Sequence, residues 1–105
     1  NISSEVFMTT HLENIADALK LRLEKSKMSG KTITLKIKYS DFVTQTRSKT
    51  IPYYTSDISL ILEVAKELLF QDQLKNSVRL LGISLSNFKN PTEKKKVEAQ
   101  LKLSF

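Results

Sequence analysis

Apolar and polar residues alternate along residues 31–39, where isoleucine, leucine and tyrosine are separated by threonine and lysine. A period of two is typical of a β-strand with one buried and one exposed face. After Ser40 and Asp41, a pair suited to a turn, residues 43–50 are rich in β-branched side chains and alternate again. We therefore predict a β-hairpin with one apolar and one polar face.

The predicted hairpin carries four cations that we expect on one face of the sheet: Lys36, Lys38, Arg47 and Lys49. Like charges on a flat surface repel one another, so this arrangement favours a polyanion bound against it. A solvated sheet face with ordinary surface charge explains the same pattern. Both interpretations stay open at this point.

A first helix is predicted to begin at Thr10, because Thr10 and Glu13 fit a capping box in which each side chain bonds the other's backbone N–H. An apolar stripe follows at helical spacing: Leu12, Ile15, Ala16, Leu19 and Leu23. We expect the helix to end near Met28, with Gly30 as its left-handed exit. His11, the only histidine, is expected to be exposed.

A second helix is predicted after Pro52, which should close the preceding strand because proline cannot donate to a ladder. Thr55 or Ser56 can cap this helix, and its end is expected near Phe70 or Gln71. Its inward stripe is Ile58, Ile61, Leu62, Ala65, Leu68 and Leu69.

Two more strands complete the expected set, a short one in residues 2–8 and a longer one over residues 77–88. In the longer segment the apolar side chains change parity, so strict alternation would expose half of them. A β-bulge between Leu80 and Gly82 resolves the conflict.

The predicted order is strand, helix, strand, strand, helix, strand. This is the split βαβ (βαββαβ) pattern, an α+β fold in which a four-stranded sheet carries two helices on one face. Right-handed crossovers would place the first and third strands in the centre. The uncovered face is expected to present Lys36, Lys38, Arg47, Ser48, Lys49, Arg79, Ser84 and Ser86.

The amino-acid composition limits the classes of partner that the chain is expected to bind. The 105 residues include 17 Lys and Arg against 11 Asp and Glu, a net charge of +6, which favours nucleic acid, an anionic membrane or an acidic protein. Cysteine is absent, which excludes disulfides and thiolate metal sites. No apolar run reaches transmembrane length and no signal-peptide order is present, so we expect a cytoplasmic protein. Because Asn1 replaces the usual Met, we expect a fragment of a longer chain.

The tail, residues 90–105, differs in character, so we divide the chain into a domain of residues 1–89 and this tail. Lys94, Lys95 and Lys96 resemble a solvated linker or tether. The apolar island that follows, from Gln100 to Phe105, needs a pocket. It would either add an extra strand to the domain or dock into a partner.

Three segments, TLKIKYSDF (34–42), TRSKT (46–50) and SVRLLGISLSNF (77–88), together resemble the little-finger domain of Y-family translesion DNA polymerases of the bacterial polymerase IV type. The resemblance spans about residues 1–89. It implies a split βαβ domain whose open sheet lies in the major groove of duplex primer–template DNA and grips phosphates without reading sequence. The residues that match the family's motifs are Arg79, Arg47 and Ser48. Together with the residues expected on the uncovered face, the predicted DNA-binding set is Lys36, Lys38, Arg47, Ser48, Lys49, Arg79 and Ser84.

The same resemblance implies that the fragment is not catalytic and holds no cofactor. The family's active site, with carboxylates that bind magnesium, belongs to preceding palm and finger regions. Leu80 departs from members that have a second arginine there, so the contact of that arginine with the template is not expected.

The terminal hexapeptide QLKLSF resembles the sliding-clamp motif that ends many bacterial members. By this resemblance Gln100, Leu101, Leu103 and Phe105 bind the bacterial sliding clamp. Chemically, a glutamine can bond at the rim of a pocket while the apolar side chains fill a cleft.

Other functions are weighed by what they require. An RNA-recognition module needs exposed aromatic side chains on its central strands, and the predicted polar face has none. A small ferredoxin-like enzyme needs convergent acids, bases or nucleophiles, which this sequence does not supply. A protein-interaction module remains an alternative because the tail could dock into a partner.

Overall fold

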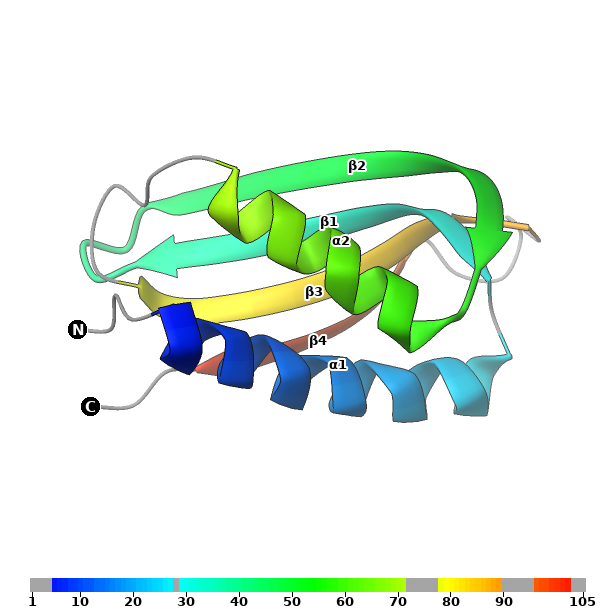
Figure 1. The fold of residues 1–105 in the computed structure, drawn as a ribbon, viewed down its shortest axis with the longest axis horizontal. Coiled ribbons are helices and arrows are strands. Elements are labelled where there is room, and N and C mark those ends of the chain that lie inside the picture. Colours follow the sequence, from blue (N-terminus) through cyan, green and yellow to red (C-terminus); the bar gives the residue numbers. More distant parts are fainter. Residues whose placement is uncertain (1–4, 28, 72–77, 90–95, 103–105) are drawn as a thin grey trace.

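The computed structural model describes residues 5–27, 29–71, 78–89 and 96–102 and forms two layers. The elements are α1 (Glu5–Ser26), β1 (Gly30–Tyr39), β2 (Thr44–Thr55), α2 (Ile58–Phe70), β3 (Val78–Phe88) and β4 (Lys96–Lys102), as Figure 1 shows. The four strands form one sheet in the order β2-β1-β3-β4, and all neighbouring strands are antiparallel.

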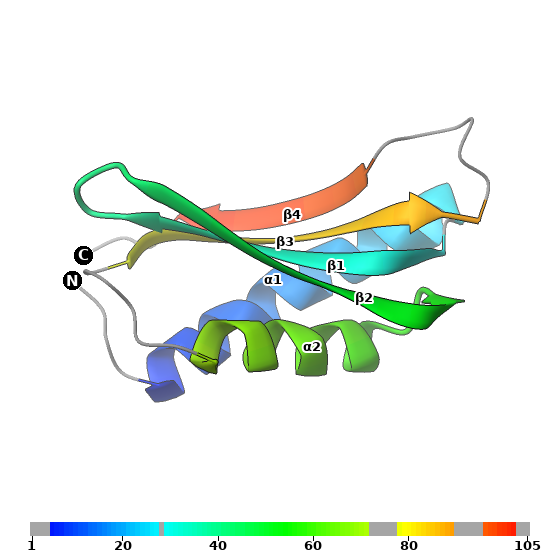
Figure 2. The same cartoon turned by 90° about the horizontal axis from the view of Figure 1, so that it is seen from above.

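Both helices cover the same face of the sheet (Figure 2). Helix α1 packs on β3 and β4, and α2 packs on β1 and β2. The core lies between the layers, where Leu12, Leu19, Leu35, Leu69 and Ile83 are fully buried. Neither α1 nor α2 covers the other face, so its side chains are not packed against either helix.

The predicted α+β class, with a four-stranded sheet and two helices on one face, is confirmed. The order βαββαβ is wrong, because the described elements follow the order αββαββ: α1 already includes residues 5–8 of the predicted first strand, and the fourth strand is β4 from the tail. The central strands are accordingly β1 and β3, the second and fourth of the predicted set, and the strand over residues 43–50 lies at an edge.

Helix α1 begins at Glu5, before the start that was predicted at Thr10. Glu5–Met8 is helical rather than extended, and Met8 is buried one turn before Leu12, so the apolar stripe continues backwards. The predicted capping box is wrong, since Thr10 lies inside the helix and its hydroxyl donates to the Val6 carbonyl at 3.0 Å. Threonine commonly makes this bond to the preceding turn within helices.

The exit from α1 uses Lys27 rather than Gly30. Lys27 has a φ of 55°, and its N–H donates to the Leu23 carbonyl at 2.8 Å. Gly30 starts β1, where a Cβ would lie 2.5 Å from the Ser86 carbonyl oxygen. Glycine is therefore needed here for close approach to β3, and not for a left-handed turn.

Strand β2 continues past Pro52 to Thr55, contrary to the prediction. An edge strand tolerates a missing N–H on its open side. The register shift between Gly30 and Thr32 accommodates Pro52 as well, because these residues pair with Thr55 and Thr50.

Helix α2 is capped by Asp57, whose carboxylate accepts from the Ser59 N–H at 3.0 Å, rather than by the predicted Thr55 or Ser56. Thr55 supports the cap, since its hydroxyl accepts from the Asp57 N–H at 3.0 Å. The helix ends at Phe70, as predicted.

The predicted bulge in the last strand is present one position earlier. Lys38 pairs with Leu80 and Tyr39 with Val78, which leaves Arg79 as the extra residue. Val78 and Leu81 can therefore both face the core. Gly82 pairs regularly.

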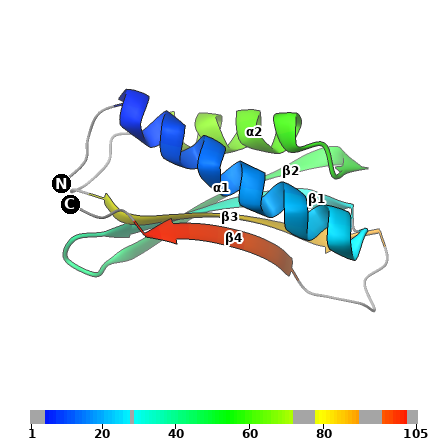
Figure 3. The same ribbon diagram turned by 90° about the horizontal axis from the view of Figure 1, so that it is seen from below.

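The tail completes the sheet instead of acting as a tether. Strand β4 pairs with β3 along its whole length, and Val97 and Ala99 are buried. Figure 3 shows α1 beside β4, where the Arg22 guanidinium donates to the Glu98 carbonyl. The extra strand predicted for Gln100–Phe105 is thus confirmed as far as Lys102, and it begins earlier than expected, because Lys96, predicted as part of the linker, already belongs to β4. Residues 103–105 lie outside the described part.

Candidate nucleic-acid interface

The face opposite the helices, here called the open face, is built from short polar side chains and a few cations. Antiparallel pairing places directly opposed residues on the same side of a sheet, so the registers define its members. They are Thr32, Thr34, Lys36 and Lys38 of β1, Thr44, Thr46, Ser48 and Thr50 of β2, Leu80, Gly82, Ser84 and Ser86 of β3, and Glu98 and Gln100 of β4.

The centre of the open face is a row of hydroxyls. Ser48, Thr34 and Ser84 lie side by side across three strands, and none of their hydroxyls hydrogen-bonds another described residue. Short side chains leave the surface low, so a nucleic-acid backbone can approach the sheet closely. Serine and threonine hydroxyls are frequent donors to phosphate oxygens.

Cations gather toward the turn that joins β1 to β2. Lys36 and Lys38 are partly exposed on β1, and the bulge places the partly exposed Arg79 beside Lys38. These are the side chains that supply charge to phosphate contacts in nucleic-acid complexes. The registers confirm the predicted placement of Lys36, Lys38, Ser48 and Ser84 on one face, and Arg79, the extra residue of the bulge, adjoins Lys38 there.

Arg47 and Lys49, in contrast, do not lie on the open face. Arg47 pairs with Leu35 and Lys49 with Ile33, both of which face the core. Arg47 is only 6% exposed, and its guanidinium donates to the carbonyls of Leu68 and Leu69 at 2.8 and 2.9 Å. Its position is therefore that of a cap on the C-terminus of α2.

The other neighbours of Arg47 and Lys49 also belong to the helix side. Gln45 accepts a bond from the Tyr39 hydroxyl at 2.7 Å and a long one from Arg47 at 3.4 Å. Lys49 forms an exposed ion pair with Glu67 at 3.3 Å. The prediction that all four hairpin cations share a face is wrong, and neither Arg47 nor Lys49 is available to a ligand on the open face.

The turn between β1 and β2 determines on which side of the sheet Arg47 and Lys49 lie. The Tyr39 N–H donates to the Val43 carbonyl at 2.9 Å, and the Phe42 N–H donates to the Tyr39 carbonyl at 2.9 Å. This closure pairs Lys38 with Thr44. Gln45, Arg47 and Lys49 therefore lie on the same side of the sheet as the core residues of β1. A slip of one residue would reverse the faces, and the sequence pattern alone did not set the register.

Phe42 is a residue that the sequence analysis missed as part of the site. Phe42 is 61% exposed, and the centroid of its ring lies 5.4 Å from the Lys38 ammonium and 4.5 Å from the Arg79 guanidinium. An aromatic residue in a polar turn between two cationic strands was the available signal.

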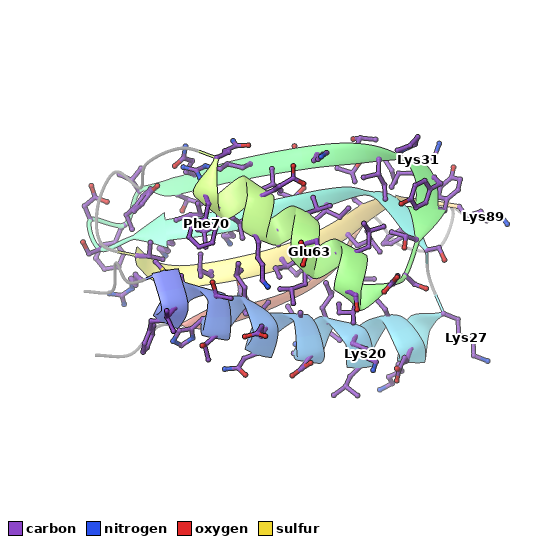
Figure 4. The ribbon with its side chains drawn as sticks, in the orientation of Figure 1. Lys20, Lys27, Lys31, Glu63, Phe70 and Lys89 are labelled. Carbon is purple, nitrogen blue, oxygen red and sulfur yellow. The ribbon has the colours of Figure 1, made fainter. Side chains whose placement is uncertain are left out.

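The opposite end of the sheet carries a separate set of cations. Lys31 lies 4.7 Å above the Tyr54 ring, and Figure 4 shows Lys31 and Lys89 together at that end. Hydroxyls there are bonded internally, since Thr32 shares a bond with Thr50 at 2.9 Å and accepts from Asn87 at 2.6 Å. This end is less free to offer hydroxyls than the central row.

His11 is only partly exposed, contrary to the prediction. Its ring lies 4.4 Å from the Phe7 ring, its Nδ1 is buried without a hydrogen bond to a described residue, and desolvation lowers the pKa of this histidine below its usual 6.5. Within the described residues, no three His, Asp or Glu side chains are grouped so that they could hold a metal ion. No helix in the described ranges is long and apolar enough to cross a membrane.

Comparison with known proteins identifies relatives. Residues 1–103 match the impB/mucB/samB family C-terminal domain. The chain is 42% identical over 86 residues to DNA polymerase IV 2 of Agrobacterium fabrum, covering 81% of this chain and 24% of that relative. It is 45% identical over 74 residues to DNA polymerase IV of Streptococcus agalactiae, covering 68% of this chain and 20% of that relative. It is 36% identical over 90 residues to DNA polymerase IV of Listeria monocytogenes, covering 85% of this chain and 25% of that relative. The chain thus spans a quarter or less of these relatives.

Proposed function

Because this chain belongs to the impB/mucB/samB C-terminal domain family, the little-finger domain of Y-family DNA polymerases of the polymerase IV type, we propose that it binds the duplex of a primer–template through its open face. One observation supports this proposal above the others. The face that neither helix covers combines Lys36, Lys38 and Arg79 with a central row of hydroxyls.

The proposed contacts are made to phosphates and not to base edges. Base reading in the major groove usually requires a helix or ribbon whose long side chains reach the bases. Both helices here lie on the far side of the sheet, and the centre of the open face carries only Ser48, Thr34 and Ser84. Phosphate contacts position a protein on DNA without specifying sequence.

Titration of two unrelated duplexes, followed by fluorescence anisotropy, tests this proposal. Lys36→Ala should weaken binding to both duplexes alike and lower the slope of log K against log salt by about one unit. Lys20→Ala, an exposed lysine on α1, is the matched control and should bind as the wild type does. Equal losses in both variants, salt-insensitive binding, or a hundredfold preference for one duplex would contradict the proposal.

We also propose that the domain holds DNA for a polymerase active site located in other parts of the full protein, where magnesium would bind. The domain's share of about a quarter of each relative supports this division of labour. A variant of a relative from which this domain has been deleted should still incorporate nucleotides at high DNA concentration. It should need much more DNA than the intact relative to reach the same rate of incorporation. Incorporation by the isolated 105-residue chain would contradict the division.

A second proposal concerns the tail, for which the resemblance of QLKLSF to a clamp-binding motif is the support. We propose that Gln100, Leu101, Leu103 and Phe105 bind a sliding clamp. Gln100 is exposed on β4 opposite Gly82, so its amide is accessible while β4 stays in the sheet.

A clamp pull-down separates the possibilities. Leu103→Ala combined with Phe105→Ala should abolish association with the clamp and leave duplex binding unchanged. Ser104→Ala is the matched control from the same peptide and should retain association. Unchanged association of the double variant would remove the motif assignment, and loss of folding would instead assign the two side chains to the core.

A further inference from the structure

Phe42 has a backbone conformation that is costly for its residue type. It lies in the turn between β1 and β2 with a φ of 68°, and the residue is 61% exposed. Residues other than glycine, asparagine and aspartate rarely adopt this left-handed region, because Cβ crowds the following carbonyl. An exposed aromatic ring in such a position gains nothing from the core.

The turn does not need the ring. Its closure depends on the backbone bonds of Tyr39 with Phe42 and Val43, and on the Asp41 carboxylate, which accepts from the Val43 N–H at 3.2 Å. Glycine or asparagine would make the same bonds with less strain. The bonds that close the turn therefore do not explain why this position holds a phenylalanine.

The contacts of the Phe42 ring indicate a role for it. The Arg79 guanidinium lies 4.5 Å from the ring centroid and the Lys38 ammonium lies 5.4 Å from it. Both distances are within the range of cation–π attraction. The two cations come from different strands, and Arg79 is the extra residue of the bulge in β3.

We propose that Phe42 is a positioning residue that holds Lys38 and Arg79 as a two-pronged cationic site for the phosphates of a bound DNA strand. The ring attracts two cations that would otherwise repel each other and spread into solvent. Arranging them before DNA arrives reduces the conformational freedom lost on binding. This inference rests on the proposed binding of duplex DNA by the open face.

Duplex affinity of three variants of the chain tests the inference. Phe42→Leu keeps an apolar side chain and every charge but removes the ring, and it should weaken duplex binding roughly three- to tenfold, since exposed cation–π contacts are modest. Phe42→Tyr keeps the ring and should restore the affinity. In a background of Lys38→Ala and Arg79→Ala, Phe42→Leu should cause no further loss.

The outcomes distinguish the inference from its premise. If Lys36→Ala weakens binding but Phe42→Leu does not, the positioning role is wrong and the open face stands. If the wild-type chain binds no duplex, the proposed function itself fails. If Phe42→Leu causes the same loss in the background without the two cations, the ring contacts DNA itself, which overturns the positioning role.

Stability provides a second readout. Phe42→Asn should keep or raise the thermal midpoint, because asparagine adopts a positive φ more readily, while duplex affinity falls as it does in Phe42→Leu. A clearly lower midpoint with unchanged affinity would assign Phe42 to folding and overturn the inference.

Discussion

Replacing Arg47 should reveal a structural residue and not a DNA contact. Its guanidinium bonds the carbonyls of Leu68 and Leu69, two of the acceptors left over at the end of α2. Each hydrogen bond to a charged group contributes about 1.5–3 kcal/mol, although removing a buried cation also removes its desolvation cost. We therefore expect Arg47→Ala to lower the free energy of unfolding by about 2–4 kcal/mol.

Urea or thermal unfolding followed by circular dichroism measures this loss. For a domain of this size it corresponds to a fall in thermal midpoint of roughly 10–20 °C. Lys49→Ala on the same strand is the matched control: its ion pair with Glu67 involves side chains that are 47% and 64% exposed, so the loss should stay below about 1 kcal/mol.

Duplex binding completes the test of Arg47. At a temperature where Arg47→Ala is folded, its affinity for duplex DNA should equal that of the wild type, because the side chain lies on the helix side of the sheet. If Arg47→Ala is as stable as Lys49→Ala and loses DNA affinity, the side chain must reach the open face and the register is wrong.

Three further predictions concern the stability of the fold. Leu19→Ala should cost about 2–5 kcal/mol of unfolding free energy in urea, because Leu19 is fully buried and a cavity would remain. Gly30→Ala should also destabilise the chain in the same assay, since the added Cβ would lie 2.5 Å from the Ser86 carbonyl oxygen, and an unchanged midpoint would show that the strands can separate there. Desolvation lowers the pKa of His11, so the unfolded chain binds its proton more readily and stability should fall as the pH drops below about 6.5; His11→Asn should remove that part of the pH profile.

The sequence predicted the elements with a strong single period. The stripe through Leu12 and Leu19 marked α1, and the alternation through Leu35 marked β1, because burial of one face imposes those periods. The change of parity near Leu80 also predicted a real bulge, since no regular strand could bury both Val78 and Leu81.

Features that depend on pairing were harder to predict. Arg47 and Lys36 are both cations in alternating strands, and only the turn geometry decides that one is buried while the other is open. The strand over Lys96–Lys102 was not distinguishable from a tether, because its burial of Val97 and Ala99 exists only once β3 and α1 are in place.

The most direct test of the account is to map which face meets DNA. In ¹⁵N-labelled chain titrated with a duplex at low salt, amide signals of Thr34, Lys36 and Ser84 should shift progressively, whereas those of Leu21 and Glu63 on the outer sides of the helices should not. Raising the salt should reverse the shifts, as expected for phosphate contacts. Shifts confined to α1 and α2, with the signals of Thr34, Lys36 and Ser84 unchanged, would contradict the claim that the open face binds DNA.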